Sequence, residues 1–159
     1  MEEVNSLKIK GVIEVSEKKL VGFRVVCDDM KGYAEEIPKT SLLLNRRKDE
    51  IKNLIEPVRL YGAFKATETL EEDDGYWVCY EVYDFEDVPA GMVPLRVPAQ
   101  KCAVLGFKGH SSDIFNVYPH LHRWIDDNGY KRSTDKWTIE VYSKWTSNED
   151  EVDLCDPIY

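Results

Sequence analysis

A histidine, two serines and an aspartate follow one another at His110, Ser111, Ser112 and Asp113, and these are the residue types of a hydrolase triad. A catalytic triad is assembled in space from separate elements, whereas these four residues are neighbours in the chain. The segment also lacks the closing glycine of a nucleophile elbow. We therefore interpret it as a segment that caps a helix, with Ser112 as the cap, and not as a catalytic site.

The histidines and cysteines are poorly spaced for metal binding. His120 and His122 are two residues apart, and on a helix such side chains diverge by about 200°, so a shared metal ion is not expected. The four cysteines form no CxxC pair; they are Cys27, Cys79, Cys102 and Cys155. We predict reduced, mostly buried thiols, no metal and no cofactor.

The charge balance restricts the class of partner. The 159 residues include 21 Lys and Arg against 30 Asp and Glu, a net charge of −9. Phosphate neutralisation requires a basic surface, so direct binding of nucleic acid or of an anionic membrane is not expected. A cationic ligand or a basic protein partner is compatible with this charge.

The chain shows no sequence signal for export or membrane insertion. No apolar run approaches the roughly 20 residues of a membrane span. Residues 1–4 (MEEV) lack the basic and apolar regions of a signal peptide. The sequence therefore predicts a cytoplasmic protein.

The first half of the chain, residues 18–85, contains an alternating strand at its start, in which Val21, Phe23 and Val25 share one face. A helix is predicted to open at Ile37-Pro38, with the proline in the first turn, and to end at Pro57. The predicted order is a strand (18–28), this helix, a strand (59–66), an acidic turn (67–75) and a strand (76–85).

Three prolines separate this half from the next. Pro89, Pro94 and Pro98 exclude a helix or a central strand from residues 86–99, which we interpret as an ordered, extended crossover.

The second half, residues 100–159, repeats the same order. Its predicted helix has a face formed by Ile114, Tyr118, Leu121 and Ile125, is kinked or broken near its start by Pro119, and stops at Asn128-Gly129. The other predicted elements are a strand (100–109), a strand (137–145), an acidic turn (147–151) and a final strand (152–159).

Each half therefore consists of strand, helix, strand, acidic turn and strand. Gly22-Phe23-Arg24 and Gly106-Phe107-Lys108 occupy the same place in the two first strands. The repeat predicts one α+β domain over residues 1–159, with a single antiparallel sheet, two helices on it and a cleft at the seam between the halves.

With these elements in place, the sequence resembles the GyrI-like effector-binding domains of bacterial transcription activators, from about Leu20 to the C-terminus. The resemblance rests most specifically on residues 76–109. The segments that carry it are LVGFRV (20–25), IP (37–38), YGAF (61–64), YWVCYEVYDFEDVPAGM (76–92), VPAQKCAVLGFKGHSSD (97–113), WIDDNGY (124–130) and IEVY (139–142).

The resemblance implies a pseudo-two-fold pair of βαββ units and a pocket for lipophilic cations with a strand glutamate at its bottom. That glutamate matches Glu140. A carboxylate among aromatic rings attracts a delocalised cation through its charge and through cation–π contacts. From the residues alone, the alternative is an exposed glutamate on a solvated strand face.

Strand alternation places Glu140 and Tyr142 on the same face. If LYGAF aligns with IEVYS, Tyr61 lies opposite Glu140 and either lines the pocket or bonds to the carboxylate. Further candidates for ligand contact are Trp77, Tyr80 and Phe107, although alternation cannot place all three on one face. Core packing is the alternative for these three side chains.

The sequence departs from the regulators of the family in two places. About 19 residues precede the first matched strand, too few for a helix-turn-helix, which predicts a stand-alone domain without direct promoter binding. Lys39-Thr40-Ser41 stand where the family often has a tryptophan, which implies a more polar or more open pocket wall.

Three functions remain open at this stage. The first is a module that binds a small lipophilic, cationic or aromatic compound. The second, implied by the resemblance, is a hydrolase of reactive cyclopropane-bearing compounds, in which Glu140 acts as acid or base and Tyr61 orients the substrate. The third is an inhibitor that acts on a protein partner such as DNA gyrase.

Overall fold

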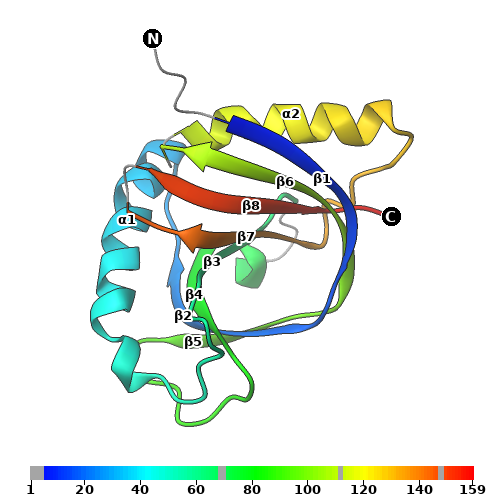
Figure 1. The fold of residues 1–159 in the computed structure, drawn as a ribbon. Coiled ribbons are helices and arrows are strands. Elements are labelled where there is room, and N and C mark those ends of the chain that lie inside the picture. The colour runs from blue at the N-terminus through cyan, green and yellow to red at the C-terminus, as the bar shows by residue number, and fades with distance from the viewer. Residues whose placement is uncertain (1–5, 68–70, 111–112, 147–148) are drawn as a thin grey trace.

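The computed structural model describes residues 6–67, 71–110, 113–146 and 149–159 (Figure 1). Its eight strands and two α-helices are β1 (Ser6–Val15), β2 (Lys18–Val25), α1 (Met30–Arg46), β3 (Leu60–Lys65), β4 (Tyr76–Val82), β5 (Val93–Val97), β6 (Gln100–Gly109), α2 (Ile114–Asp127), β7 (Trp137–Lys144) and β8 (Asp150–Pro157). Two short 3-10 turns, Lys48–Glu50 and Glu71–Asp73, complete these elements.

The strands form one antiparallel sheet in the order β1-β6-β8-β7-β3-β4-β2-β5. This order is symmetric about the contact between β7 and β3. The unit β2-α1-β3-β4 and the unit β6-α2-β7-β8 are therefore related by a pseudo-two-fold axis, which confirms the predicted duplication. Strand β1 precedes the first unit in the chain but pairs with β6 of the second unit. Strand β5 precedes the second unit but pairs with β2 of the first unit. The two edge strands of the sheet are therefore related in the same way as the two units.

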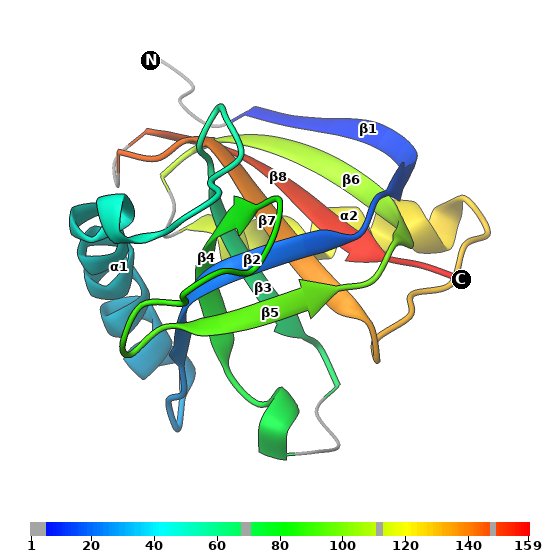
Figure 2. The same ribbon diagram turned by 90° about the horizontal axis from the view of Figure 1, so that it is seen from below.

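Both helices lie on the same face of the sheet, set apart from each other (Figure 1, Figure 2). One hydrophobic cluster packs under α2 and includes Leu105, Leu121 and Leu154. A second packs under α1 and includes Leu44 and Val78. The third cluster contains strand residues and no residue of either helix, so it fills the opposite face of the curved sheet. The helix-covered face is left open over β3 and β7, between the two helices.

The first helix differs from its predicted bounds at both ends. It begins at Met30, not at Ile37, because the side chain of Asp29 caps it by accepting a hydrogen bond from the backbone N–H of Gly32 at 2.8 Å. Pro38 consequently lies inside the helix and not in its first turn. The helix ends at Arg46, well before Pro57, and a 3-10 turn follows it.

The second helix runs continuously through Pro119 from Ile114, so the predicted break is wrong. Its end at Asn128 and Gly129 is confirmed, since Asn128 is the C-cap and Gly129 has a positive φ of 78°. The predicted cap, Ser112, lies outside the described residues.

Strand β1 was not predicted, although it forms one edge of the sheet. Its alternation is interrupted at Gly11, where the register with β6 shifts by one residue. The crossover prediction agrees with the structure in that Pro94 lies in β5, a strand at the other edge. An edge strand tolerates proline because its outer N–H positions need no partner in the sheet.

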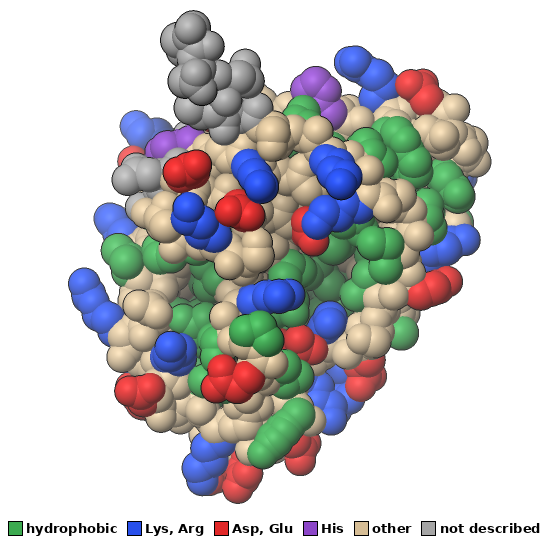
Figure 3. Space-filling model, viewed as in Figure 1, with side chains coloured by type: hydrophobic (Ala, Val, Ile, Leu, Met, Phe, Trp, Pro, Cys, Tyr) green, Lys and Arg blue, Asp and Glu red, His purple; other side chains and the backbone are tan. Residues whose placement is uncertain are grey.

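Two further observations concern surface and solvent. Acidic and basic side chains are interspersed over the face seen in Figure 3, with hydrophobic side chains between them. Within the part of the chain that the structure describes, no helix has the length and apolar character that crossing a membrane requires.

All four cysteines are free, and three of them are buried.

The Asp29 cap gives a direct test of where α1 begins. We expect Asp29→Ala to lower the free energy of unfolding by about 1 kcal/mol, because one N–H of the first turn loses its acceptor. The matched control is Asp28→Ala, which removes an adjacent exposed carboxylate that caps nothing and should change stability by less than about 0.5 kcal/mol. Urea unfolding of both variants measures the difference; equal stabilities would place the helix start elsewhere.

Candidate functional site

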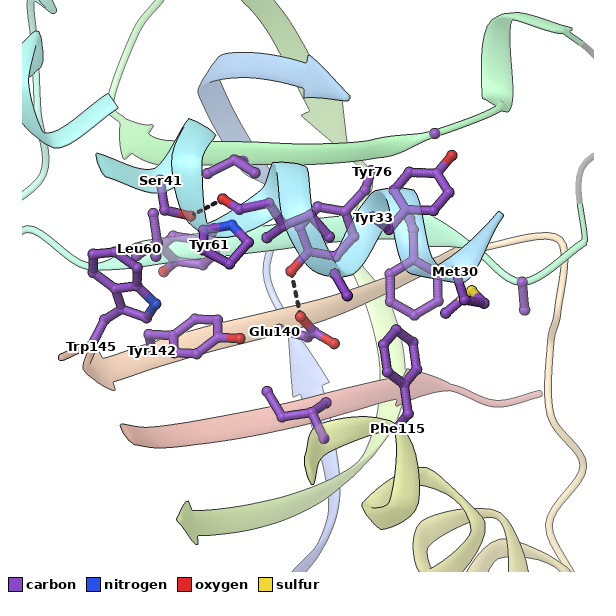
Figure 4. Close-up of a pocket in the computed structure, with 18 of the residues that line it drawn as sticks. Met30, Tyr33, Ser41, Leu60, Tyr61, Tyr76, Phe115, Glu140, Tyr142 and Trp145 are labelled. Atoms are coloured by element: carbon purple, nitrogen blue, oxygen red, sulfur yellow. Dashed lines mark hydrogen bonds between the residues drawn. The ribbon is translucent and has the colours of Figure 1, made fainter. Parts of the chain in front are cut away.

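A pocket of about 570 Å³ lies on the helix-covered face, over the seam between the two units (Figure 4). Its walls come from α1, β3, β4, β7 and the start of α2. Most of the side chains that line it are aromatic or aliphatic. They include Met30, Tyr33, Ile37, Leu60, Phe64, Tyr76, Ile114, Phe115, Tyr142 and Trp145, together with Glu140 and Ser41.

Glu140 is the acidic side chain of this pocket. It lies in the middle of β7 and is only 5% exposed. Each of its carboxylate oxygens accepts a hydrogen bond from a tyrosine. The hydroxyl of Tyr118, on α2, donates to Oε2 at 2.7 Å. The hydroxyl of Tyr76, at the start of β4, donates to Oε1 (Figure 4). The carboxylate is thus fixed by residues from both units.

Burial raises the pKa of Glu140 above its ordinary value, and the two tyrosine hydrogen bonds oppose this effect only in part. Burial and the nearby Glu140 charge also raise the pKa values of Tyr76 and Tyr118, so both tyrosines remain protonated donors. Among the described residues, no cationic side chain forms an ion pair with Glu140. Ionisation of Glu140 therefore leaves a buried charge without a counter-charge, which is costly.

Lys65 borders the pocket, yet its charge is used elsewhere. Its ammonium group pairs with Asp73 at 3.3 Å and lies 5.0 Å from the centre of the Trp137 ring. These contacts leave the negative potential of Glu140 available to a molecule that enters the pocket.

A glycine makes room for the tyrosine on β4. Gly62 pairs directly with Glu140 across the β3–β7 contact, and a Cβ at this position would collide with the hydroxyl of Tyr76 and lie 3.0 Å from Oε1 of Glu140. Any larger residue would displace the Tyr76 hydroxyl. Gly62 is thus the reason that a tyrosine from the next strand reaches the carboxylate.

Aromatic packing holds the tyrosines in place. Phe64 stacks on Tyr76 with ring centres 5.9 Å apart and meets Tyr118 edge-on at 6.1 Å. Contacts of this kind favour one ring orientation over others. The carboxylate and its two donors therefore form a pre-organised set, and Phe64 is itself exposed to the pocket.

Of the residues predicted from the sequence, the structure brings Glu140 and Tyr142 together in the pocket, two positions apart on the same face of β7. Tyr61 is among the residues that border the pocket, although its side chain packs in the cluster on the opposite face of the sheet. The prediction that it lies opposite Glu140 is wrong, because Gly62 does and Tyr61 pairs with Val141. The Tyr61 hydroxyl donates to Glu81 at 2.9 Å and not to Glu140.

The other three predicted side chains are not among the residues that line the pocket. Trp77 packs edge-on against Trp137, 5.1 Å between ring centres, in the cluster on the opposite face of the sheet. Tyr80 lies under α1 and Phe107 under α2. All three side chains are therefore packed in the hydrophobic core, which was the alternative to ligand contact.

Sequence reasoning missed the two tyrosines that hold the carboxylate. A signal was present for each of them. Tyr118 belongs to the apolar face predicted for the second helix, and Tyr76 opens a strand in which it alternates onto the same face as Val78. The aromatic residues at the pocket entrance, Tyr33 and Phe115, come from the first turns of the two helices.

A duplicated βαββ fold with a glutamate in an aromatic pocket at its seam defines an effector-binding domain of the GyrI-like type. The family model of Cass2, the integron-associated effector binding protein, matches residues 12–158. The chain belongs to this family of effector-binding proteins. None of the curated protein sequences matches the chain.

Solved structures share the fold at low sequence identity. The C-terminal domain of EcmrR matches with a TM-score of 0.70 and 20% identity over 99% of both chains. The integron cassette protein VCH_CASS2 of Vibrio cholerae matches with a TM-score of 0.67 and 13% identity, covering 97% of this chain and 99% of that one. SAV2435, solved with bound tetraphenylphosphonium, matches with a TM-score of 0.68 and 9% identity, covering 96% and 94%.

The chain spans only part of a longer relative. It covers 57% of the EcmrR chain seen in complex with DNA, with a TM-score of 0.69 and 20% identity. The match to the separate C-terminal domain accounts for this share.

The raised pKa of Glu140 predicts how stability depends on pH. Because the folded protein holds this proton more tightly than the unfolded chain does, its contribution to stability is complete below the ordinary glutamate value of 4.5 and is lost as pH rises through the folded-state pKa. Glu140→Gln stays neutral, so its stability relative to the wild type should increase with pH over this range and then level off.

Thermal unfolding between pH 4 and pH 8 measures this difference. Glu35→Gln makes the same change at an exposed position of α1 and is the control. A constant difference between Glu140→Gln and the wild type across the range would contradict a raised pKa.

Proposed function

We propose that this protein binds lipophilic organic cations in the pocket, with Glu140 as the counter-charge. The observation that carries this proposal is the buried carboxylate, which has two hydrogen-bond donors but no cationic partner among the described residues. A large, delocalised cation loses little hydration when it enters an apolar site, whereas a small ammonium ion loses much more.

The walls of the pocket support the same class of ligand. The rings of Tyr33, Phe64, Tyr76 and Phe115 line the pocket and can make cation–π contacts with a charge held near the carboxylate. A volume of about 570 Å³ is in the range of sites for drug-sized molecules. The related fold of SAV2435 holds tetraphenylphosphonium, a cation of this kind.

The proposed role is that of a cytoplasmic sensor or sequestering protein for such compounds. Any contact with a transcription complex or with a protein such as gyrase would be made through surfaces other than the pocket.

Hydrolysis of a reactive ligand is the second candidate function. The feature that favours it is the burial of the Glu140 carboxyl group, which raises its pKa and lets it hold a proton at a pH at which an exposed glutamate has lost it. The same residues would serve binding and turnover, so product analysis after incubation with an electrophilic cyclopropane-bearing compound separates the two.

Two ions of the same shape and opposite charge test the binding proposal. We expect tetraphenylphosphonium to bind the wild-type protein and tetraphenylborate not to bind. Glu140→Gln should weaken phosphonium binding by about tenfold or more, because a neighbouring opposite charge favours the ionised carboxylate by about 1–3 pKa units.

Isothermal titration calorimetry gives these affinities, and the pH dependence provides a second check. Since a protonated Glu140 offers no charge, phosphonium affinity should fall by up to about tenfold for each pH unit below the pKa of Glu140, until it reaches the affinity of Glu140→Gln. Equal affinity for the two ions, or an unchanged affinity in Glu140→Gln, would refute the proposal.

A further inference from the structure

The hydroxyl of Tyr142 takes no part in the hydrogen bonds that hold Glu140. The structure buries four tyrosines, and three of them bond to protein groups: Tyr61 to Glu81, Tyr80 to Asn45 and Tyr118 to Glu140. Tyr142 is 8% exposed and lines the pocket, and its hydroxyl has no hydrogen-bond partner among the described residues. The hydroxyl is not enclosed in the core without a partner; it opens into the pocket, where water or a bound molecule can accept a hydrogen bond from it.

The surroundings of Tyr142 differ from the rest of the pocket. Figure 4 shows Tyr142 with Trp145, Leu60 and Ser41 toward one side of Glu140, and Phe115, Met30 and Tyr33 toward the other. The first group carries polar atoms, whereas the second is mostly apolar. Glu140 lies between a polar end and an aromatic end of the same pocket.

The polar end offers donors. The Ser41 hydroxyl already donates to the carbonyl of Ile37 at 2.8 Å, so its proton is used within α1. The Trp145 indole N–H can only donate. Burial, together with the Glu140 charge, raises the pKa of Tyr142 far above its ordinary value, so its hydroxyl keeps its proton. An anionic group here would be repelled by Glu140, and a neutral acceptor would not.

We infer that the pocket selects lipophilic cations that carry a neutral hydrogen-bond acceptor, such as a ketone or an amide, and that Tyr142 recognises this acceptor. The inference rests on the proposed function, since Glu140 must hold the positive charge. The aromatic body of the ligand then lies toward Phe115 and Tyr33, and the acceptor lies toward Tyr142. Tetraphenylphosphonium has no hydrogen-bond acceptor, so it can contact Glu140 and the aromatic rings but cannot accept a hydrogen bond from Tyr142.

Two matched cations test the inference. (4-Oxopentyl)triphenylphosphonium and (4-methylpentyl)triphenylphosphonium have the same charge and nearly the same shape, and differ by a carbonyl oxygen in place of a methyl group. The wild-type protein should bind the ketone about three- to tenfold more tightly, the effect of one neutral hydrogen bond. In Tyr142→Phe the ratio should fall to about one, with the affinity for the methyl compound nearly unchanged.

The control variant is Tyr80→Phe, which removes a buried tyrosine hydroxyl outside the pocket lining and should keep the wild-type ratio. Equal binding of the two cations by the wild type would overturn the inference and leave the proposed function intact. A preference for the ketone that persists in Tyr142→Phe would overturn the role of Tyr142. If neither cation binds, the proposed function and this inference both fail.

Discussion

The hydrogen-bonded carboxylate of Glu140 joins the two units of the fold at the centre of the pocket. A charge buried at the centre of a sheet is tolerated only where donors surround it, and here Tyr76 and Tyr118 supply one donor for each oxygen. These tyrosines come from different units of the duplicated fold, so the carboxylate is held only when both units are packed together. Burial at this contact also raises the pKa of Glu140, so that the empty pocket favours the protonated form of this side chain.

The pocket lies at the seam of the pseudo-two-fold repeat, and the residues at the seam differ between the two units. Two helices placed symmetrically leave the strands at the seam, β3 and β7, uncovered. At the seam, β7 contributes Glu140 while the paired position on β3 is Gly62. A second carboxylate opposite Glu140 would raise the cost of ionisation, and a larger side chain would displace Tyr76. The seam therefore provides the carboxylate of Glu140, the space beside Gly62 and a set of aromatic rings.

The sequence predicted the fold class and the order of the elements in the two βαββ units, because strand alternation and the repeat are local patterns. It did not predict β1, and it gave the segment that contains β5 as an extended crossover. It also gave Glu140 through the family resemblance. The sequence failed to predict which residue of β3 pairs with Glu140, because this depends on the register of two strands. Aligning LYGAF with IEVYS placed Tyr61 opposite Glu140. In the structure Gly62 pairs with Glu140, one residue further along, and the Tyr61 side chain points to the other face of the sheet. The partners Tyr76 and Tyr118 reach Glu140 through contacts between elements, which no single-strand pattern contains.

In the proposed function, a bound cation takes the place of the proton on Glu140. Infrared difference spectroscopy on addition of tetraphenylphosphonium, at a pH where the empty protein holds this proton, measures this exchange. We expect loss of the C=O stretch of a protonated carboxylic acid and gain of carboxylate bands, with neither change in Glu140→Gln. Binding without any carboxyl signal, or with the same signal in Glu140→Gln, would contradict it.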